Sequence, residues 1–368
     1  MTTPAGPGVV IPSGLDLKGL FTAYDAAFRA AIQGDNSTVY QRLAFVPSQA
    51  DMMAATTSYG SKTLADGRTV GCQFLRFPFP MIAGAPEDWD WGAPRRITQA
   101  KLAYVEMELR RKAPKDEEQY FEMLDASVFG IVRNNLNLML DRAPKVWDYM
   151  LADAINANGN AYDGIPFFTP KSTPHPANPA EKILNPDGTA ASFYNDIQIS
   201  AVNVPSLREA VNLLELVPGF DGQHLDTGTK TKIWAIAPTP TLEMQLRDVF
   251  QGNIQPQSLN AASAATGPNE GLRGKAEVML WKDLRRGTPV GIKSGLTADN
   301  VFYLMSVPSN IQKAFIVCPR RQPTPHYMGL NPNDPSRIET GGVRYGWYVF
   351  GGAQLALPQR AVRVQITG

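Results

Sequence analysis

Hydrophobic residues recur every three or four positions through the middle of the chain, which is the spacing of an amphipathic helix. Pro114 and the acidic residues at 116–118 favour a helix start there, and the pattern predicts one long helix over 116–158. Pro144 should kink it or break it briefly. At 1.5 Å per residue it would span on the order of 60 Å. Its apolar residues are Tyr120, Phe121, Leu124, Val128, Ile131, Val132, Leu136, Met139, Val146, Trp147, Met150, Leu151 and Ile155.

Three shorter helices are predicted by the same spacing. One covers 15–33 and ends at Gly34. A second covers 206–216, with Ser206 as the N-cap and Glu209 in the capping-box position. The third covers 242–250, directly after a proline pair.

Strands are predicted where apolar and polar residues alternate or where short apolar runs occur. Asp66 and Gly67 predict a hairpin turn just before a strand at 72–77. Helices and strands alternate over 201–330, so we expect a separate mixed α/β lobe there and an α+β protein as a whole. The remaining strands are predicted at 101–112, 232–237, 276–281, 301–307, 314–318, 341–352 and 360–366.

Prolines and aromatic residues crowd together between Phe77 and Trp91, without helical or strand period. A free loop with so much apolar surface would be a liability on a monomer, so we expect a contact surface between subunits. The chain holds 31 Gly and 30 Pro, about 17% against a typical ~12%, which predicts long irregular arms that other copies cover. The candidate inter-subunit contacts are Phe77, Phe79, Trp89 and Trp91.

The charge balance gives the chain no overall attraction to nucleic acid or to an anionic membrane, because its net charge is only +1. Small basic clusters remain, and no aromatic residues of the kind that stack on bases lie among them. We interpret these residues as salt-bridging, or as facing DNA without reading its sequence. They are Arg110, Arg111, Lys112, Arg285 and Arg286, with Arg320 and Arg321 as a third cluster.

The residues of known catalytic and metal sites are not in the required patterns. His175, His224 and His326 are widely separated, and Cys72 and Cys318 cannot form a Cys-x-x-Cys knuckle. We therefore expect no enzyme, no cofactor and no metal. Cysteine usage predicts a reducing compartment without a disulfide. The lack of a signal peptide or membrane span in the sequence predicts a protein made and used in a cytoplasm.

The stretch after the long helix predicts a chain reversal that ends in a buried aromatic pair. Asn158 and Gly159 tolerate the positive φ that a helix end needs, and Asp163 with Gly164 predicts a second turn. Pro166 stiffens the exit into Phe167–Phe168. An ordinary helix-turn-strand junction of any α+β protein would also produce this pattern.

The same stretch resembles the major head subunit family of Mu-like phages, the T-type capsid proteins. The likeness lies in Leu-Ala-Asp-Ala at 151–154, the Asn/Gly break, Tyr-Asp-Gly-x-Pro-Phe-Phe at 162–168, and His175–Pro176. The insert between Phe168 and His175 is longer than that family leads us to expect. At residue level only this region is specific, whereas the order of elements is similar to the Hong Kong 97-type capsid fold over most of the chain.

The resemblance implies an N-terminal arm (1–48), an extended β-hairpin loop (49–99), a peripheral domain with a spine helix (100–200 and 331–368) and a mixed α/β axial domain (201–330). It implies a virion capsid protein, assembled in the host cytoplasm into hexamers and pentamers around phage dsDNA that it contacts non-specifically. Separate scaffold, portal and decoration proteins are implied partners, and a membrane is not. Two alternatives stay open: the shell protein of a cellular nanocompartment, and a soluble α+β enzyme or carbohydrate-binding protein.

Overall fold

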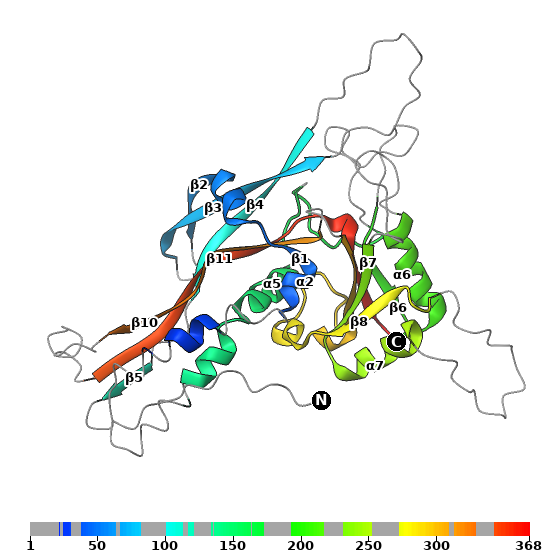
Figure 1. Ribbon diagram of the computed structural model, residues 1–368. Helices are drawn as coiled ribbons and strands as arrows, with labels where there is room; N and C mark the ends of the chain where they lie inside the picture. The colour runs from blue at the N-terminus through cyan, green and yellow to red at the C-terminus, as the bar shows by residue number, and fades with distance from the viewer. Residues whose placement is uncertain are drawn as a thin grey trace, which may run out of the picture.

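A long sheet and a smaller second sheet organise the chain, as the computed structural model shows (Figure 1). The structure describes residues 22, 25–30, 38–63, 67–81, 101–112, 117–120, 134, 136–162, 164–172, 193–216, 231–251, 272–308, 313–328 and 342–368. The mixed α+β class predicted from the sequence is confirmed. The helices are α2 (Val39–Leu43), α3 (Gln49–Ala54), α5 (Val146–Ala157), α6 (Val204–Leu216) and α7 (Pro240–Phe250), with 3₁₀ turns η2 (Lys282–Arg286), η3 (Ala298–Asn300) and η4 (Pro358–Arg360). The strands are β1 (Ala44–Phe45), β2 (Thr56–Thr63), β3 (Thr69–Met81), β4 (Lys101–Lys112), β5 (Glu117–Tyr120), β6 (Asp196–Ile199), β7 (Thr231–Ala237), β8 (Ala276–Leu280), β9 (Val301–Pro308), β10 (Phe315–Met328), β11 (Gly342–Leu355) and β12 (Ala361–Ile366).

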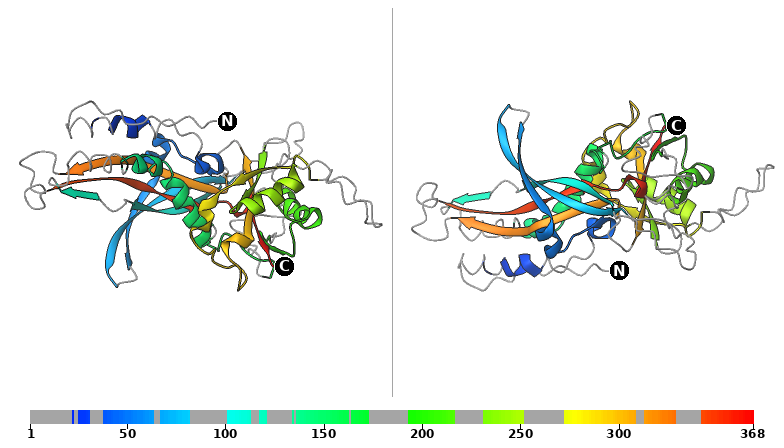
Figure 2. Two further views of the ribbon diagram at one scale, coloured as in Figure 1. Left: turned by 90° about the horizontal axis from the view of Figure 1, so that it is seen from below. Right: turned by 90° about the horizontal axis from the view of Figure 1, so that it is seen from above.

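The long sheet runs in the order β1-β10-β11-β4-β3-β2, and β5 also pairs with β11. Strand β11 meets β4 over only three residue pairs, from Val349 to Gly351. Beyond that short contact, β2, β3 and β4 turn away from β10 and β11. Figure 2 shows the result: the β2–β3 hairpin projects from the body of the molecule.

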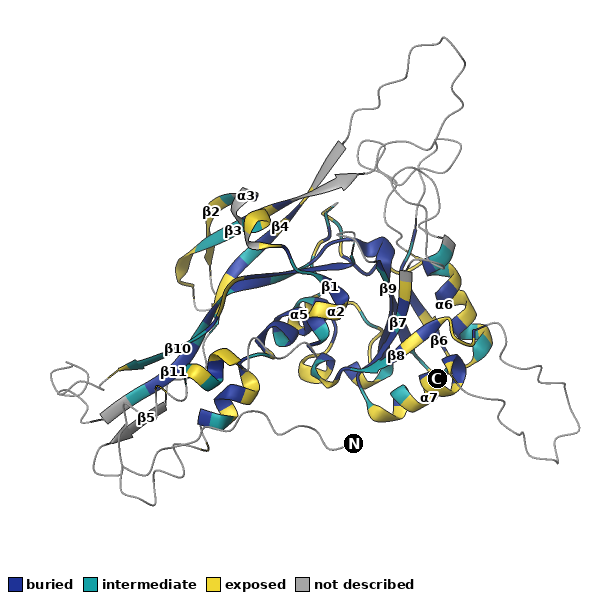
Figure 3. Ribbon diagram, in the orientation of Figure 1, coloured by how far each residue is buried: buried dark blue, intermediate teal, exposed yellow. Residues whose placement is uncertain are grey.

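The second sheet has the order β6-β12-β9-β7-β8, and its central strand β9 is buried on both faces. Phe302 and Leu304 face the core that α6 and α7 cover, while Tyr303 and Met305 face the core that contains α5. The buried residues therefore form a continuous interior that links the two sheets (Figure 3). A strand covered on both faces is apolar at most positions, which is why Val301 to Met305 form a continuous hydrophobic run.

Local capping fixes the ends of several helices. Thr239 caps α7, its side chain accepting a hydrogen bond from the Leu242 amide, and Pro240 takes the first helical position. Helix α6 begins at Val204, two residues earlier than predicted, and the Asn203 side chain accepts from the Ser206 amide. The prediction of Ser206 as the cap was therefore wrong, because an asparagine upstream supplies the same acceptor.

The predicted helix start at Asp116 is also wrong. Residues 117–120 form β5, which pairs with β11 from Gly342 to Tyr345. The sheet edge offers this segment backbone partners, and tertiary pairing overrides the local helical pattern. Residues 121–133 lie outside the described part of the chain. Helical structure covers 136–142 and then α5, and it is interrupted at 143–145, where Pro144 predicts a break.

Prolines occur within two long strands. The irregular stretch expected at 78–80 instead continues β3, with Pro78 opposite Tyr104 of β4. Strand β2 begins at Thr56 opposite Arg76, so within the described part of the chain the other edge of β3 has no partner strand at Pro78 and Pro80. A missing amide on that edge costs no ladder hydrogen bond. Strand β10 continues past Cys318 to Met328, and its pairing with β11 shifts register at Pro319 and at Pro323, whereas Pro325 pairs in register with Trp347.

The turn after α5 is confirmed as predicted. Asn158 ends the helix in the left-handed conformation, with φ 46°, and its side chain exchanges two hydrogen bonds with the Phe168 backbone, at 2.7 and 3.2 Å. Gly164 has φ +78°. Phe167 and Phe168 are buried and pack edge to face, with ring centroids 4.8 Å apart.

A buried ion pair lies beside this turn and joins two neighbouring strands of the second sheet. Arg363 of β12 donates to Asp196 of β6 at 2.7 Å, and both side chains are almost completely buried. Arg363 also donates to the carbonyls of Val290 and Gly291, and its guanidinium lies 5.0 Å from the Phe168 ring centroid. Thus one arginine links the turn, two strands and the loop after η2.

Candidate functional site

The outer half of the β2–β3 hairpin is exposed on both faces. Residues 58–63 of β2 and 67–71 around the turn are all exposed, and Gly67 makes the turn with φ +82° (Figure 3). A two-stranded hairpin is at best marginally stable in water unless something packs against it. Hence this hairpin has the form of an element that a neighbouring molecule covers.

The inner half of the hairpin packs on its own chain. Leu75 and Phe77 of β3 are buried with Val105 and Met107 of β4, against residues of β10. The Phe77 ring meets Phe45 edge to face, with 6.4 Å between centroids. Phe77, a predicted inter-subunit contact, is only 6% exposed and is therefore a core residue of its own subunit. Alternation along β3 directs it inward, and the sequence alone could not show which face of the strand is covered.

The structure says less about the other three aromatic residues that we predicted as contacts between subunits. Phe79 lies in β3 opposite Ala103 of β4. Trp89 and Trp91 lie outside the described residues. As contacts between subunits, these three residues stay predictions.

Among the hairpin side chains that the structure describes, the most exposed aromatic residue is one that the sequence did not point to. Tyr59 of β2 is 83% exposed and pairs in register with Gln73. It lies on the same face as Leu75, further out along the hairpin, where the chain no longer covers that face. The signal was weak, because Tyr59 stands alone among small and polar residues and so produces no hydrophobic alternation.

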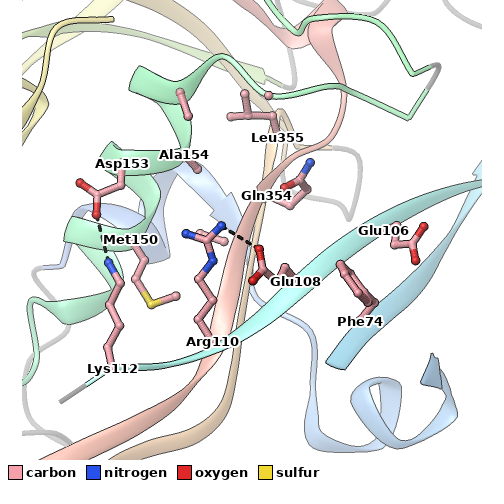
Figure 4. A pocket seen from close by; sticks show the side chains of 13 residues that line it. Phe74, Glu106, Glu108, Arg110, Lys112, Met150, Asp153, Ala154, Gln354 and Leu355 are labelled. Carbon is pink, nitrogen blue, oxygen red and sulfur yellow. Dashed lines mark hydrogen bonds and ion pairs between the residues drawn. The ribbon is translucent and has the colours of Figure 1, made fainter. Parts of the chain in front are cut away.

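A groove of about 430 Å³ lies at the base of the hairpin, between β4 and α5 (Figure 4). Its lining includes Phe74, Met150 and Leu355 as apolar surface. Charged side chains alternate along one face of β4 and point toward it, because every second residue of a strand faces the same way. These residues are Glu106, Glu108, Arg110 and Lys112.

Ion pairs connect the walls of the groove. Glu108 accepts from Arg110 at 2.8 Å and from Lys62 of β2 at 3.1 Å. Burial opposes the charge on Glu108, but these two cations more than compensate and hold the pKa of its carboxyl below the usual range. Lys112 reaches across to Asp153 of α5 at 3.0 Å.

The remaining basic candidates lie around the same wall or beyond it. Arg286 of η2 stacks over the Tyr149 ring, 4.5 Å from its centroid, and lies 3.6 Å from Asp153. Arg285 forms a bidentate pair with Asp299. Arg111 is exposed and faces away from the groove. The structure brings Arg110 and Lys112 into the lining of the groove and leaves Arg111, Arg285 and Arg286 outside it, although Arg286 approaches Asp153 of that lining.

Within the described ranges, no group of three or more His, Cys, Asp and Glu side chains is arranged to hold a metal ion. Nor is any helix of the described part long and apolar enough to cross a membrane. Cys72 lies on β3, and Cys318 is buried in β10, where burial raises the pKa of its thiol to about 12.

No protein-family model matches the chain, and no curated protein matches it. Among solved structures it is similar to a chain of the capsid of the cyanophage P-SCSP1u, at 11% identity and a TM-score of 0.46, over 90% of this chain and 89% of that one. It is also similar to a chain of the procapsid of bacteriophage JBD30, at 15% identity and a TM-score of 0.40, over 96% and 77%. A virus-like particle from Pyrococcus furiosus matches at 10% identity and a TM-score of 0.41, over 94% and 98%. At these TM-scores, the function proposed below has to rest on the geometry of this chain.

Proposed function

We propose that this chain is the major capsid protein of a tailed phage, whose copies assemble into a closed icosahedral shell around dsDNA. The observation that carries the proposal is the projecting β2–β3 hairpin, whose outer half is exposed on both faces. A monomeric protein gains nothing by ordering such an element, because the conformational entropy lost is not offset by burial. A shell subunit gains a surface that the next copy covers.

The chain's charge and sequence pattern support the same role. A net charge of +1 lets many copies approach one another without strong repulsion. The Tyr-Asp-Gly-x-Pro-Phe-Phe turn, which forms the junction that the family resemblance leads us to expect, joins α5 to the second sheet. Membership of the Mu-like head subunits is the finer form of this proposal.

The proposal assigns roles to the parts of the chain. Residues 1–48 form the arm, 49–99 the extended loop, 100–200 with 331–368 the peripheral domain, and 201–330 the axial domain around which hexamers and pentamers close. Basic side chains on the inner surface, Arg111 among them, contact packaged DNA without reading its sequence. The shell assembles in the host cytoplasm, and separate scaffold, portal and decoration proteins complete the particle.

Electron microscopy of the purified chain tests this function. Closed particles of uniform size are expected at low micromolar concentration or above. A chain that stays monomeric with its hairpin folded against its own body would refute the proposal. Particles that enclose a cargo enzyme and no DNA would instead favour the nanocompartment alternative.

A single substitution tests the hairpin directly. Tyr59→Ala should leave the subunit folded, because this side chain is 83% exposed, while assembly weakens. A buried aromatic anchor contributes roughly 2 kcal/mol or more to an interface, so each contact should weaken by about 30-fold. The measurement is the critical concentration for particle formation, followed by light scattering and sedimentation.

Met244→Ala provides the matched control, because Met244 is also an exposed apolar residue, at 67%, but lies on α7 in the second lobe. Equal critical concentrations for Tyr59→Ala and the unmodified chain would argue against the hairpin as an assembly contact.

A further inference from the structure

We propose that Glu108 is a positioning residue that sets the angle at which the β2–β3 hairpin leaves the body. Its consequence for assembly rests on the proposed function, because a hairpin must point correctly to meet the next copy. The residues that carry the inference are Lys62, Cys72, Glu108 and Arg110, called the Glu108 cluster below.

The Glu108 cluster connects three neighbouring strands. Lys62 stands near the outer end of β2 and pairs in register with Val70 of β3. Its ammonium group crosses β3 to reach the Glu108 carboxylate on β4, at 3.1 Å. The Cys72 thiol of the intervening strand lies 3.8 Å from the same carboxylate. The contact therefore runs diagonally over the hairpin and joins its free edge to the strand that is anchored in the body.

The backbone alone holds this angle loosely. Strand β2 hydrogen-bonds only to β3, because it is the last strand of the sheet. Two-stranded ribbons vary in twist more than wide sheets do. Among the described residues, the Lys62–Glu108 pair is the one ion pair that joins β2 to another strand. Because the twist of the hairpin is easily changed, we expect the Lys62–Glu108 ion pair to set the angle at which the hairpin leaves the body.

The position of the hairpin end is sensitive to this angle. Thr63 lies seven residues beyond Thr56, which is about 23 Å along an extended strand. A rotation of about 12° at the base would therefore move the end by about 5 Å, the spacing between neighbouring strands. Tyr59, three residues beyond Thr56 and so about 10 Å along the strand, would move by about 2 Å, which is enough to disturb its packing on a partner surface.

The contact is suited to positioning more than to overall stability. Lys62 and Arg110 are about half exposed, and ion pairs of that kind contribute little to the free energy of unfolding. Glu108 itself is the more enclosed member, with 22% of its side chain exposed, and it receives both cations. Its removal should therefore change where the hairpin points and leave the melting temperature nearly unchanged.

The experiment measures the hairpin position in the free subunit, with spin labels at Ser61→Cys and Leu138→Cys. Ser61 is exposed on β2, and Leu138 is 51% exposed in the helical stretch 136–142. Cys72→Ser removes the competing thiol with a side chain of similar shape, while Cys318 is buried and unreactive. Pulsed electron-spin resonance then gives the distance between the labels.

Glu108→Gln in this background is compared with Glu106→Gln. Glu106 projects from the same face of β4, two residues away, and has no ion-pair partner among the described residues. Ser61 lies about 17 Å along the strand from Thr56, so Glu108→Gln should shift or broaden the label distance by roughly 3 Å, whereas Glu106→Gln should reproduce the parent distribution. Lys62→Met should cause the same change, and the double variant should add nothing to it.

Assembly provides the second readout. Without the labels, Glu108→Gln should form particles about tenfold more slowly, within the range over which association rates vary among variants of one interface. An unchanged label distance in Glu108→Gln, or an equal change in Glu106→Gln, would overturn the positioning role. If the distance shifts but the unmodified chain forms no particles, the proposed function fails while the positioning role stands.

Discussion

Replacing Arg363 with methionine should destabilise the subunit far more than removing an exposed arginine. The guanidinium is fully buried and donates at 2.7 Å to Asp196 and at 2.7 Å to the Val290 carbonyl. Methionine keeps much of the side-chain volume but leaves the Asp196 carboxylate buried, with the Gln365 amide, at 2.8 and 2.9 Å from its two oxygens, as its remaining side-chain partner among the described residues. An uncompensated buried charge is the costly result, because its desolvation is no longer offset.

The expected loss is about 3–5 kcal/mol, the cost of breaking a buried ion pair by removing one partner. A typical domain is stable by only ~5–15 kcal/mol, so this would be a large fraction of the total. Arg247→Met serves as the matched control, because Arg247 pairs with Glu243 one helical turn away on exposed α7. Its loss should cost only ~0.3–0.5 kcal/mol.

Urea unfolding followed by tryptophan fluorescence measures both losses on the free subunit. The double variant Asp196→Asn with Arg363→Met should recover part of the lost free energy, because no charge is then buried without a partner. Equal losses for Arg363→Met and Arg247→Met would show that the buried ion pair does not stabilise the packing of β6, β12 and the turn, and our reasoning about this network would be wrong.

Substitutions at Gly351 and Asn158 give two further predictions, and urea unfolding followed by tryptophan fluorescence checks both. Gly351→Ala should cost about 3 kcal/mol or prevent folding, since its Cβ would overlap the Cys318 carbonyl of β10 and lie 2.7 Å from the Trp147 ring, whereas Gly71→Ala, with open space around it, should be nearly neutral. A neutral Gly351→Ala would contradict the close packing of β11 against β10 and α5. Asn158→Ala should lower the free energy of unfolding by about 2–3 kcal/mol, because alanine is strained in the left-handed conformation and the two hydrogen bonds to Phe168 are lost. Asn158→Gly should cost clearly less, because glycine adopts that conformation without strain. Equal costs for the two variants would show that the backbone conformation contributes nothing.

Sequence reasoning located the hairpin and its turn but not the contact residue on it. Asp66–Gly67 identified the turn because few residues tolerate positive φ. Phe77 was chosen as a contact because it is aromatic and near prolines, yet β10 covers its face of the strand. Tyr59 was passed over because exposure is decided by what does or does not pack on a strand, and that depends on residues hundreds of positions away.

The groove at the base of the hairpin is another feature that the sequence alone could not predict. A basic run at 110–112 is visible in the sequence, but the alternation of a strand separates Arg111 from Arg110 and Lys112. Their partners, Glu108 and Asp153, come from the same strand and from α5. Only the packing of α5 beside β4 brings these carboxylates and cations to one place.

The sequence by itself determined the features that depend on neighbouring residues: the mixed class, the break at Pro144, the reversal at Asn158 and the buried pair at Phe167 and Phe168. These are local, because φ preferences and side-chain periodicity act within a few residues. The tertiary structure decided that 117–120 pairs as a strand, that β3 continues through its prolines, and that the hairpin leaves the body uncovered. Strand pairing and burial are settled between distant segments, so the surface from which we argue function exists only in the folded chain.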